Sequence, residues 1–211
     1  MRRRCFLKKK QVHAAEQKRE DVVKARNEWK EKQEKNIFMA DKLVFLDESG
    51  VNIDMVRRYG RARNKERVHD YTPGNTPKKT TLVSSVRLDG TLAYEFFQGS
   101  LNGQNFLNYI QNTLVPTLKK GDIVVMDNLS CHKVKGIKEA IESVGASVLY
   151  LPPYSPDLNP IEMMWSKMKA FLRKLRYDTV ELLHSAIPNA FSAVSLSDIS
   201  GWFSASGYSL S

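Results

Sequence analysis

Short runs of apolar residues, separated by polar and turn-forming stretches, divide the middle of the chain into strand candidates. Runs of this length with turn signals on both sides are typical of buried strands. The candidates are residues 43–48, 55–63, 81–87, 92–97, 122–127 and 147–151. The pair Asp89-Gly90, which lies between two of these runs, predicts a hairpin turn.

Longer segments carry apolar residues three and four positions apart, which is the spacing of one helix face. They are residues 102–118, 133–144 and 160–176. Residues 8–36 differ, because they contain no Gly or Pro and are rich in Lys, Glu, Gln and Ala. That composition favours a polar helix with only a thin apolar stripe, formed by Val22, Ala25 and Trp29.

The order of these elements predicts an α/β fold. A meander of strands is followed by helix, strand, helix, strand and helix, and such crossovers join parallel strands. We therefore expect a mixed five-stranded sheet flanked by helices, with an N-terminal linker helix. The expected parts are a basic linker helix at 1–40, an α/β core at 41–177, and a helical extension at 178–211 that packs on the core.

Composition narrows the class of protein. Of the 211 residues, 42% are hydrophobic, which is ordinary for a globular domain. No apolar run is long enough for a membrane span or a signal peptide, so we expect no membrane partner. Cys5 and Cys131 fit neither a metal-binding spacing nor a disulfide framework. We therefore expect a reducing compartment and a cytoplasmic, nucleoid-associated protein.

Positive charge is concentrated at the start of the chain. The formal net charge is +10, and the first 40 residues, with 13 Lys/Arg and 6 Asp/Glu, account for +7 of it. A basic arm on a nearly balanced domain indicates a polyanionic partner. On charge alone, a solvated helix with no partner is an equal alternative.

Three carboxylates are placed by three separate pieces of local structure. Asp47 and Asp127 each end an apolar run, and Glu162 lies just inside the start of a helix. If the two runs pair in parallel, both aspartates lie at one edge of the sheet. Two carboxylates about 4 Å apart repel by about 4 kcal/mol at an effective dielectric near 20, and a cation offsets that repulsion. The pattern predicts a divalent-metal site and phosphodiester chemistry, since Mg²⁺ prefers oxygen ligands and phosphate.

Each acid also has a purely structural interpretation. Asp is common where strands end, because it suits turns and caps. For Glu162, an N-cap at Asn159 with Pro160 as the first helical residue would give the spacing of a capping box. Taken singly, these interpretations weigh at least as much as catalysis, and only the combination of three acids favours a metal site.

Four segments together resemble the catalytic domain of DDE transposases from bacterial insertion sequences, in the superfamily that includes mariner. They are LVFLDESG (43–50), RRYGRA (57–62), GDIVVMDNLSCHK (121–133) and LPPYSPDLNPIEMMWSKMK (151–169). The last is the most specific, because its prolines, Asn, Glu and Trp recur in fixed order. The spacing of 34 residues between Asp127 and Glu162 also fits, and the resemblance covers about residues 41–208.

The resemblance implies a ribonuclease H-like fold and a catalytic, metal-binding triad of Asp47, Asp127 and Glu162. It also implies two Mg²⁺ or Mn²⁺ ions, and double-stranded DNA partners in the form of transposon ends and target. The transposition complex is expected to contain a homodimer. Family members usually carry helix-turn-helix domains ahead of this core, and the chain begins without them. We expect a second reading frame, a frameshift product or a truncated relic.

Several neighbouring residues are candidates for supporting roles. Asn128 and Asn159 are expected to orient the metal ligands next to them. His132 is a weaker candidate for a phosphate contact or general base, and Glu48 is left out because it should face away from Asp47. A basic cluster is expected to contact the DNA backbone, with a solvated face as the alternative. It consists of Arg57, Arg58, Arg61, Arg63, Lys65, Arg67, Lys78 and Lys79.

Two other functions compete with transposition. One is a different enzyme of the same fold, such as a junction resolvase or a ribonuclease H, against which the proline-rich segment before Glu162 argues. The other is an inactive remnant that only binds DNA or dimerises with an intact transposase. The intact triad argues against a remnant, whereas the missing N-terminal domains favour it.

Overall fold

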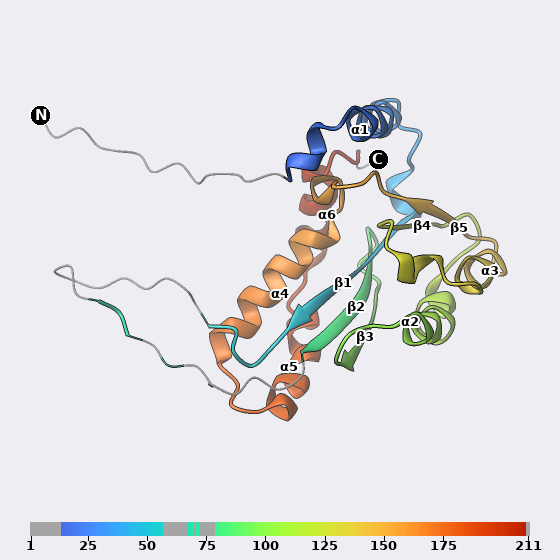
Figure 1. The fold of residues 1–211 in the computed structure, drawn as a ribbon. Coiled ribbons are helices and arrows are strands. Elements are labelled where there is room, and N and C mark those ends of the chain that lie inside the picture. Colours follow the sequence, from blue (N-terminus) through green and yellow to red (C-terminus); the bar gives the residue numbers. More distant parts are fainter. Residues whose placement is uncertain (1–13, 57–66, 70, 72–78, 210–211) are drawn as a thin grey trace, which may run out of the picture.

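A computed structural model describes residues 14–56, 67–69, 71 and 79–209, and Figure 1 shows their arrangement. Its centre is one five-stranded sheet with the strand order β3-β2-β1-β4-β5. The strands are β1 (Leu43–Val51), β2 (Thr80–Arg87), β3 (Leu92–Gln98), β4 (Ile123–Met126) and β5 (Ser147–Tyr150). The α-helices are α1 (Glu20–Glu34), α2 (Gly103–Tyr109), α3 (Ile137–Glu142), α4 (Ile161–Leu175), α5 (Val180–Ser192) and α6 (Leu196–Ala205).

The sheet is mixed, as predicted. β1 pairs antiparallel with β2, and β2 pairs antiparallel with β3. On its other side β1 pairs parallel with β4, and β4 pairs parallel with β5. The predicted hairpin between β2 and β3 is present, and Gly90 adopts φ +89°, a conformation that glycine reaches without strain. This arrangement confirms the ribonuclease H-like α/β fold.

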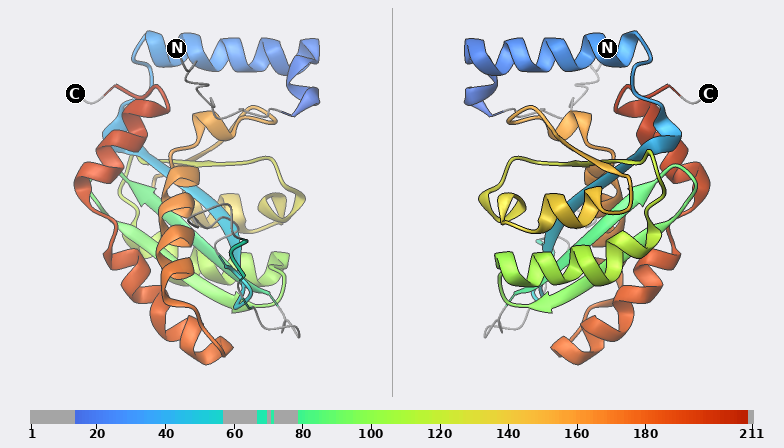
Figure 2. Two further views of the ribbon diagram at one scale, coloured as in Figure 1. Left: turned by 90° about the vertical axis from the view of Figure 1, so that its left-hand side faces the viewer. Right: turned by 90° about the vertical axis from the view of Figure 1, so that its right-hand side faces the viewer.

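Helices cover both faces of the sheet (Figure 2), and a separate hydrophobic core lies on each face. On one face, β1 and β2 side chains such as Phe45 and Leu82 pack against α4, α5 and α6. On the other face, alternate residues such as Val44 and Val83 pack against α2 and α3. This alternation is the period-2 pattern of a strand that is buried on both sides.

The helix at the start of the described chain begins later than the sequence predicts. A 3₁₀ turn at Ala15–Lys18 leads into α1, and residues 1–13 lie outside the described residues. Of the predicted stripe, Val22 and Trp29 are buried, with 1% and 5% of their surface exposed. The Trp29 indole donates a hydrogen bond of 3.2 Å to the Tyr208 hydroxyl, so α1 is joined to the end of the chain.

Three predicted elements differ from the structure. Met55 and Val56 are not in a strand, and the rest of the predicted strand 55–63 lies outside the described residues. The predicted helix 102–118 is α-helical only in α2, then continues as a π turn and a 3₁₀ turn, because Pro116 cannot donate a backbone hydrogen bond. The predicted helix 133–144 is shortened to α3, which begins after Gly136 with φ +99°.

The last part of the chain, predicted as a helical extension, forms two helices, α5 and α6. Ser195 and Asp198 make a capping box that starts α6 three residues after α5 ends. The Tyr94 ring of β3 stacks on Phe191 of α5 at 3.8 Å, and Phe45 of β1 meets Phe203 of α6 edge-on at 5.4 Å. Both helices therefore lie on the sheet.

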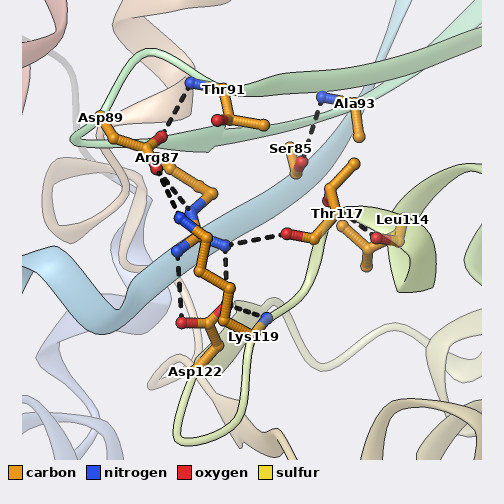
Figure 3. A network of polar contacts seen from close by, with 9 residues as sticks. All are labelled: Ser85, Arg87, Asp89, Thr91, Ala93, Leu114, Thr117, Lys119 and Asp122. Atoms are coloured by element: carbon orange, nitrogen blue, oxygen red, sulfur yellow. Dashed lines mark hydrogen bonds and ion pairs between the residues drawn. The ribbon is translucent and has the colours of Figure 1, made fainter. Parts of the chain in front are cut away.

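A buried ion pair ties β2 to the segment that enters β4 (Figure 3). The Arg87 guanidinium donates to both oxygens of Asp122, at 2.6 and 3.2 Å, and to the Thr117 carbonyl at 3.2 Å. Only 3% and 0% of the two side chains are exposed. The Lys119 backbone N–H donates to the same carboxylate at 2.7 Å, so the turn before β4 is held from two sides. Among the described residues, no helix is both long and apolar enough to cross a membrane.

Candidate active site

The parallel register of β1 and β4 brings two of the predicted acids to equivalent positions. Leu43 pairs with Ile123 and Phe45 with Val125, so continuing the register sets Asp47 opposite Asp127. Asp127 is the first residue after β4, whereas β1 continues past Asp47 to pair with β2 alone. Asp47 therefore lies just beyond the point where β4 ends, and on that side no strand pairs with β1 there.

Glu162 reaches the same pocket from the first turn of α4. The pocket has a volume of about 500 Å³. Its lining includes all three predicted acids, both predicted supporting residues and the proline-rich loop: Asp47, Asp127, Asn128, Leu129, Leu151, Pro152, Pro153, Tyr154, Ser155, Pro156, Asn159 and Glu162. Thus the structure gathers the triad and its predicted neighbours from β1, β4 and α4 into one site.

Burial and the charges of neighbouring carboxylates make two acids of this pocket, Asp47 and Glu162, reluctant to ionise. Burial, then the nearby charges of Glu162 and Glu48, raise the pKa of Asp47 to about 8. Burial also raises the pKa of Glu162, with Asp127 adding to the shift and Lys169 opposing it. Such a cluster gains stability from a cation that neutralises it. Oxygen donors of this kind suit Mg²⁺ or Mn²⁺, so the residues fit a divalent metal.

Asn159 supports the metal interpretation over the capping interpretation of Glu162. The N-cap position of α4 is Pro160, and no side chain caps it. The capping box of the structural interpretation is therefore absent: Pro160 is helical after an extended Asn159, but the Glu162 backbone N–H donates to the Asn159 carbonyl at 3.2 Å and not to its side chain. Asn159 is 4% exposed, and its Oδ1 has no hydrogen-bond partner among the described residues. A buried carbonyl oxygen facing a pocket is suited to a water or a cation.

His132 links two carboxylates that belong to different strands. Its Nδ1 lies 2.7 Å from Asp127 Oδ1, and its Nε2 lies 3.0 Å from Glu48 Oε2. Burial lowers the pKa of His132, but its bonds to Asp127 and Glu48 outweigh this and raise it to about 10. Glu48 does face away from the pocket, as predicted, yet it contacts the site through His132. The alternation of side chains along the strand was therefore the reason to leave Glu48 out of the predicted site.

Arg26 of α1 holds the proline-rich loop in place. Its guanidinium donates to both oxygens of Asp157, at 2.9 and 2.7 Å, and to the Ser155 hydroxyl at 2.7 Å. Burial raises the pKa of Asp157, but the hydrogen bond and charge of Arg26 reverse this and lower it. Tyr154 in the same loop has φ +54°, which is strained for a residue with a side chain. Its carbonyl accepts a hydrogen bond of 2.5 Å from Gln17.

Lys169 is a second residue near the acids that the sequence pattern did not single out. It lies seven positions after Glu162 on α4, which places both on one helix face. Burial lowers the pKa of Lys169, while Glu162 opposes the shift and the nearby Arg173 and Lys79 add to it. The i,i+7 spacing was the available signal. Lys79, one of the predicted DNA contacts, thus lies close enough to Lys169 to lower its pKa.

The other predicted DNA contacts are mostly beyond what the structure describes. Arg57, Arg58, Arg61, Arg63, Lys65 and Lys78 lie outside the described residues. Arg67 and Lys79 are described, and both are exposed. A backbone contact to DNA stays a prediction for the whole cluster.

The stability of the metal-free protein is expected to fall as pH rises between about 6 and 9. Asp47 keeps its proton up to about pH 8 when folded but releases it near its ordinary value of 3.8 when unfolded. His132 likewise keeps its proton to about pH 10, against an ordinary value of 6.5. The folded state therefore binds more protons than the unfolded state across this window, so stability decreases with pH.

Thermal unfolding in a chelator at several pH values measures this dependence. Asp47→Asn should flatten the slope between pH 6 and 8, and added Mg²⁺ should reduce it, because the cation replaces the lost proton. A thermal midpoint that rises with pH in the absence of metal would contradict the assignment of these two groups.

Residues 42–184 match the family described as DDE superfamily endonuclease. Two curated relatives are nematode proteins. The transposable element Tc3 transposase of Caenorhabditis elegans is 26% identical over 163 residues, which cover 72% of this chain and 49% of that protein. The transposable element Tcb2 transposase of Caenorhabditis briggsae is 29% identical over 94 residues, which cover 43% of this chain and 34% of that protein. The chain thus spans no more than about half the length of either relative.

Solved structures share the fold. The mariner Mos1 paired-end complex with Mg superimposes with a TM-score of 0.77 at 18% identity, over 96% of this chain and 65% of that one. The catalytic domain of Mos1 mariner transposase superimposes with a TM-score of 0.59 at 17% identity, over 90% of this chain and 96% of that one. At this identity the likeness establishes the common architecture of sheet and helices.

Proposed function

The chain belongs to the DDE superfamily of endonucleases, and from this premise we propose that it is the catalytic part of a DNA transposase. It cleaves transposon ends and joins the resulting 3′-OH to target DNA. The observation that carries the proposal is the convergence of Asp47, Asp127 and Glu162 on one pocket in which burial and mutual repulsion raise the pKa of Asp47. A site of this kind binds cations and, through them, phosphate.

Two Mg²⁺ or Mn²⁺ ions are the proposed cofactors, held by Asp47, Asp127 and Glu162. Bound there, such ions supply a water of lowered pKa and a clamp on the attacking and leaving oxygens of an in-line displacement. The residues themselves supply position and charge. No side chain of the pocket needs to become a covalent nucleophile.

Each pocket residue has a distinct proposed task. Asp127 presents Oδ2 to the pocket, because its Oδ1 accepts hydrogen bonds from the Leu129 N–H at 3.1 Å and from His132. Asn159 offers its carbonyl oxygen, which has no partner in the described part of the chain, and Asn128 lines the pocket next to Asp127. Outside the pocket lining, Lys169 partly balances the charge of Glu162, and its proposed task is to contact a DNA phosphate.

The proposed partners are double-stranded DNA, both transposon ends and target, and a second copy of the chain in the transposition complex. The relatives described above are nematode transposases, one of them Tc3. Origin in a bacterial insertion sequence, with a cytoplasmic and nucleoid-associated location, remains our proposal from the motifs. The DNA sequence on either side of the coding frame would test the origin, because inverted repeats should flank it.

A strand-transfer assay tests the proposed reaction. The chain, fused to a helix-turn-helix domain with a known site, is given a duplex with a pre-cut 3′-OH end and a plasmid target. Joined product that requires Mg²⁺ or Mn²⁺ and is lost in Asp47→Asn is the expected result. Nicked plasmid without joining would identify a nuclease of the same fold, and neither product would indicate an inactive remnant.

DNA binding by the unfused chain is expected to be weak, tolerant of sequence and steeply dependent on salt. The reason is that its basic excess is concentrated in the first 40 residues and in the cluster that includes Arg67 and Lys79. Each phosphate contact contributes a slope of about −0.9 to a log–log plot of affinity against salt. Fluorescence anisotropy with random and inverted-repeat duplexes measures both properties, and selective binding of the repeat would contradict the prediction.

A further inference from the structure

We propose that Glu48 and His132 form a positioning pair that holds the Asp127 carboxylate in the orientation required for metal binding. The inference rests on the function proposed above and extends it to two residues outside the pocket lining. His132 is 1% exposed, and both of its ring nitrogens face carboxylate oxygens, at 2.7 Å from Asp127 and 3.0 Å from Glu48. A buried ring with both nitrogens engaged has a single orientation.

The geometry follows from the alternation of side chains along β1. Asp47 and Glu48 are adjacent, so they point to opposite faces, Asp47 to the pocket and Glu48 beneath it. After β4, the 3₁₀ turn Ser130–Lys133 brings His132 back under Asp127, whose carbonyl oxygen lies 3.3 Å from the same Nδ1. The Phe106 ring packs against the imidazole, with 4.5 Å between centroids.

Glu48 is consequently connected to both aspartates of the triad, directly to Asp47 and through His132 to Asp127. Its backbone N–H donates a hydrogen bond of 2.8 Å to Asp47 Oδ1, and its side chain reaches Asp127 Oδ1 through His132. One oxygen of each aspartate is thus engaged by the protein, which leaves the other oxygen of each for a cation. A shared anchor also sets the spacing between the two carboxylates, on which a metal site depends.

A purely structural role for the pair is the alternative, since a buried His–Glu contact can join β1 to the loop after β4 without affecting metal. The two roles differ in what they change. A structural contact alters the thermal midpoint of the metal-free protein, whereas a positioning pair alters the affinity for metal. Partners that orient a ligand typically contribute about 10–100-fold to metal affinity.

Mn²⁺ binding to the full chain, followed by electron paramagnetic resonance at fixed pH, tests the inference. Glu48→Ala is expected to weaken the affinity for Mn²⁺ by about 10-fold or more. Glu48→Gln keeps an oxygen within reach of His132 Nε2 and should recover part of the loss. Glu95→Ala removes a β3 carboxylate that accepts a hydrogen bond of 3.2 Å from the Thr113 hydroxyl and lies outside the pocket lining. It is the matched control and should bind Mn²⁺ like the unmodified chain.

The reference variants separate the inference from the function on which it rests. If the unmodified chain binds no Mn²⁺, or if Asp127→Asn binds it equally well, the metal site itself is wrong and the inference falls with it. If Asp127→Asn loses Mn²⁺ but Glu48→Ala binds it normally, only the positioning role is overturned. Should Glu48→Ala not fold, Glu48→Asp decides in the same way, because it keeps the charge but is one methylene too short to reach His132.

Discussion

Glu162→Gln is expected to abolish strand cleavage and strand transfer, by on the order of 100-fold or more, with almost no change in the thermal midpoint. The substitution keeps the size of the side chain and its hydrogen-bonding ability but removes the charge that a divalent cation requires. Stability should survive because the structure gives Glu162 no capping role, since no side chain caps the start of α4. Burial and the charge of Asp127 raise the pKa of this carboxyl, so losing its charge removes a desolvation cost and a repulsion.

The matched control is Glu181→Gln. Glu181 also lies in the first turn of a helix, α5, where the Thr179 hydroxyl caps the helix by accepting a hydrogen bond from Leu182 N–H. It lies outside the pocket lining, so activity in the fused chain should be unchanged. If Glu162→Gln keeps its activity but loses stability, Glu162 serves the helix, and the triad assignment is wrong.

Asp122→Asn is expected to lower the free energy of unfolding by about 3–5 kcal/mol, the largest stability effect we anticipate. The replacement is nearly isosteric, but it removes the buried anionic partner that Figure 3 shows bonded to the Arg87 guanidinium, and leaves only the partly exposed Asp89 carboxylate 3.6 Å away. A buried unpaired charge costs more than the pair contributes, because desolvation of Arg87 is no longer offset. Urea unfolding followed by circular dichroism measures the loss.

Two further variants test the cause. Arg87→Met combined with Asp122→Asn should recover part of the stability, because the uncompensated charge is gone. Asp89→Asn should cost less than about 1 kcal/mol, since that carboxylate is 43% exposed and lies 3.6 Å from Arg87 Nε. Equal losses in Asp89→Asn and Asp122→Asn would contradict the explanation by burial.

The sequence alone determined the parts of this protein that depend on local pattern. Apolar runs of the right length located all five strands of the sheet, and Asp89-Gly90 located the hairpin between β2 and β3. Fixed motifs identified the superfamily and selected three acids that the fold gathers in one pocket. These predictions succeed because a strand, a turn or a motif is encoded by residues close together in the chain.

Local pattern was misleading where two interpretations fit the same residues. The spacing from Asn159 to Glu162 suits a capping box, yet the backbone places Pro160 at the cap and leaves the Asn159 oxygen without a partner among the described residues. Ser195 and Asp198 have the same kind of pattern, and there the capping box is present. The difference is set by the loop that leads into each helix, which packing against α1 constrains in the first case.

Only the tertiary structure decided which distant residues support the site. Glu48 and His132 are 84 positions apart, Arg26 and Asp157 are 131 apart, and Arg87 and Asp122 are 35 apart. Each pair joins groups whose own neighbours in sequence carry no sign of the partner. Strand order, register and the docking of α1 bring them within hydrogen-bond distance. Contacts of this kind depend on the sum of many packing interactions along the whole chain, so no local pattern encodes them.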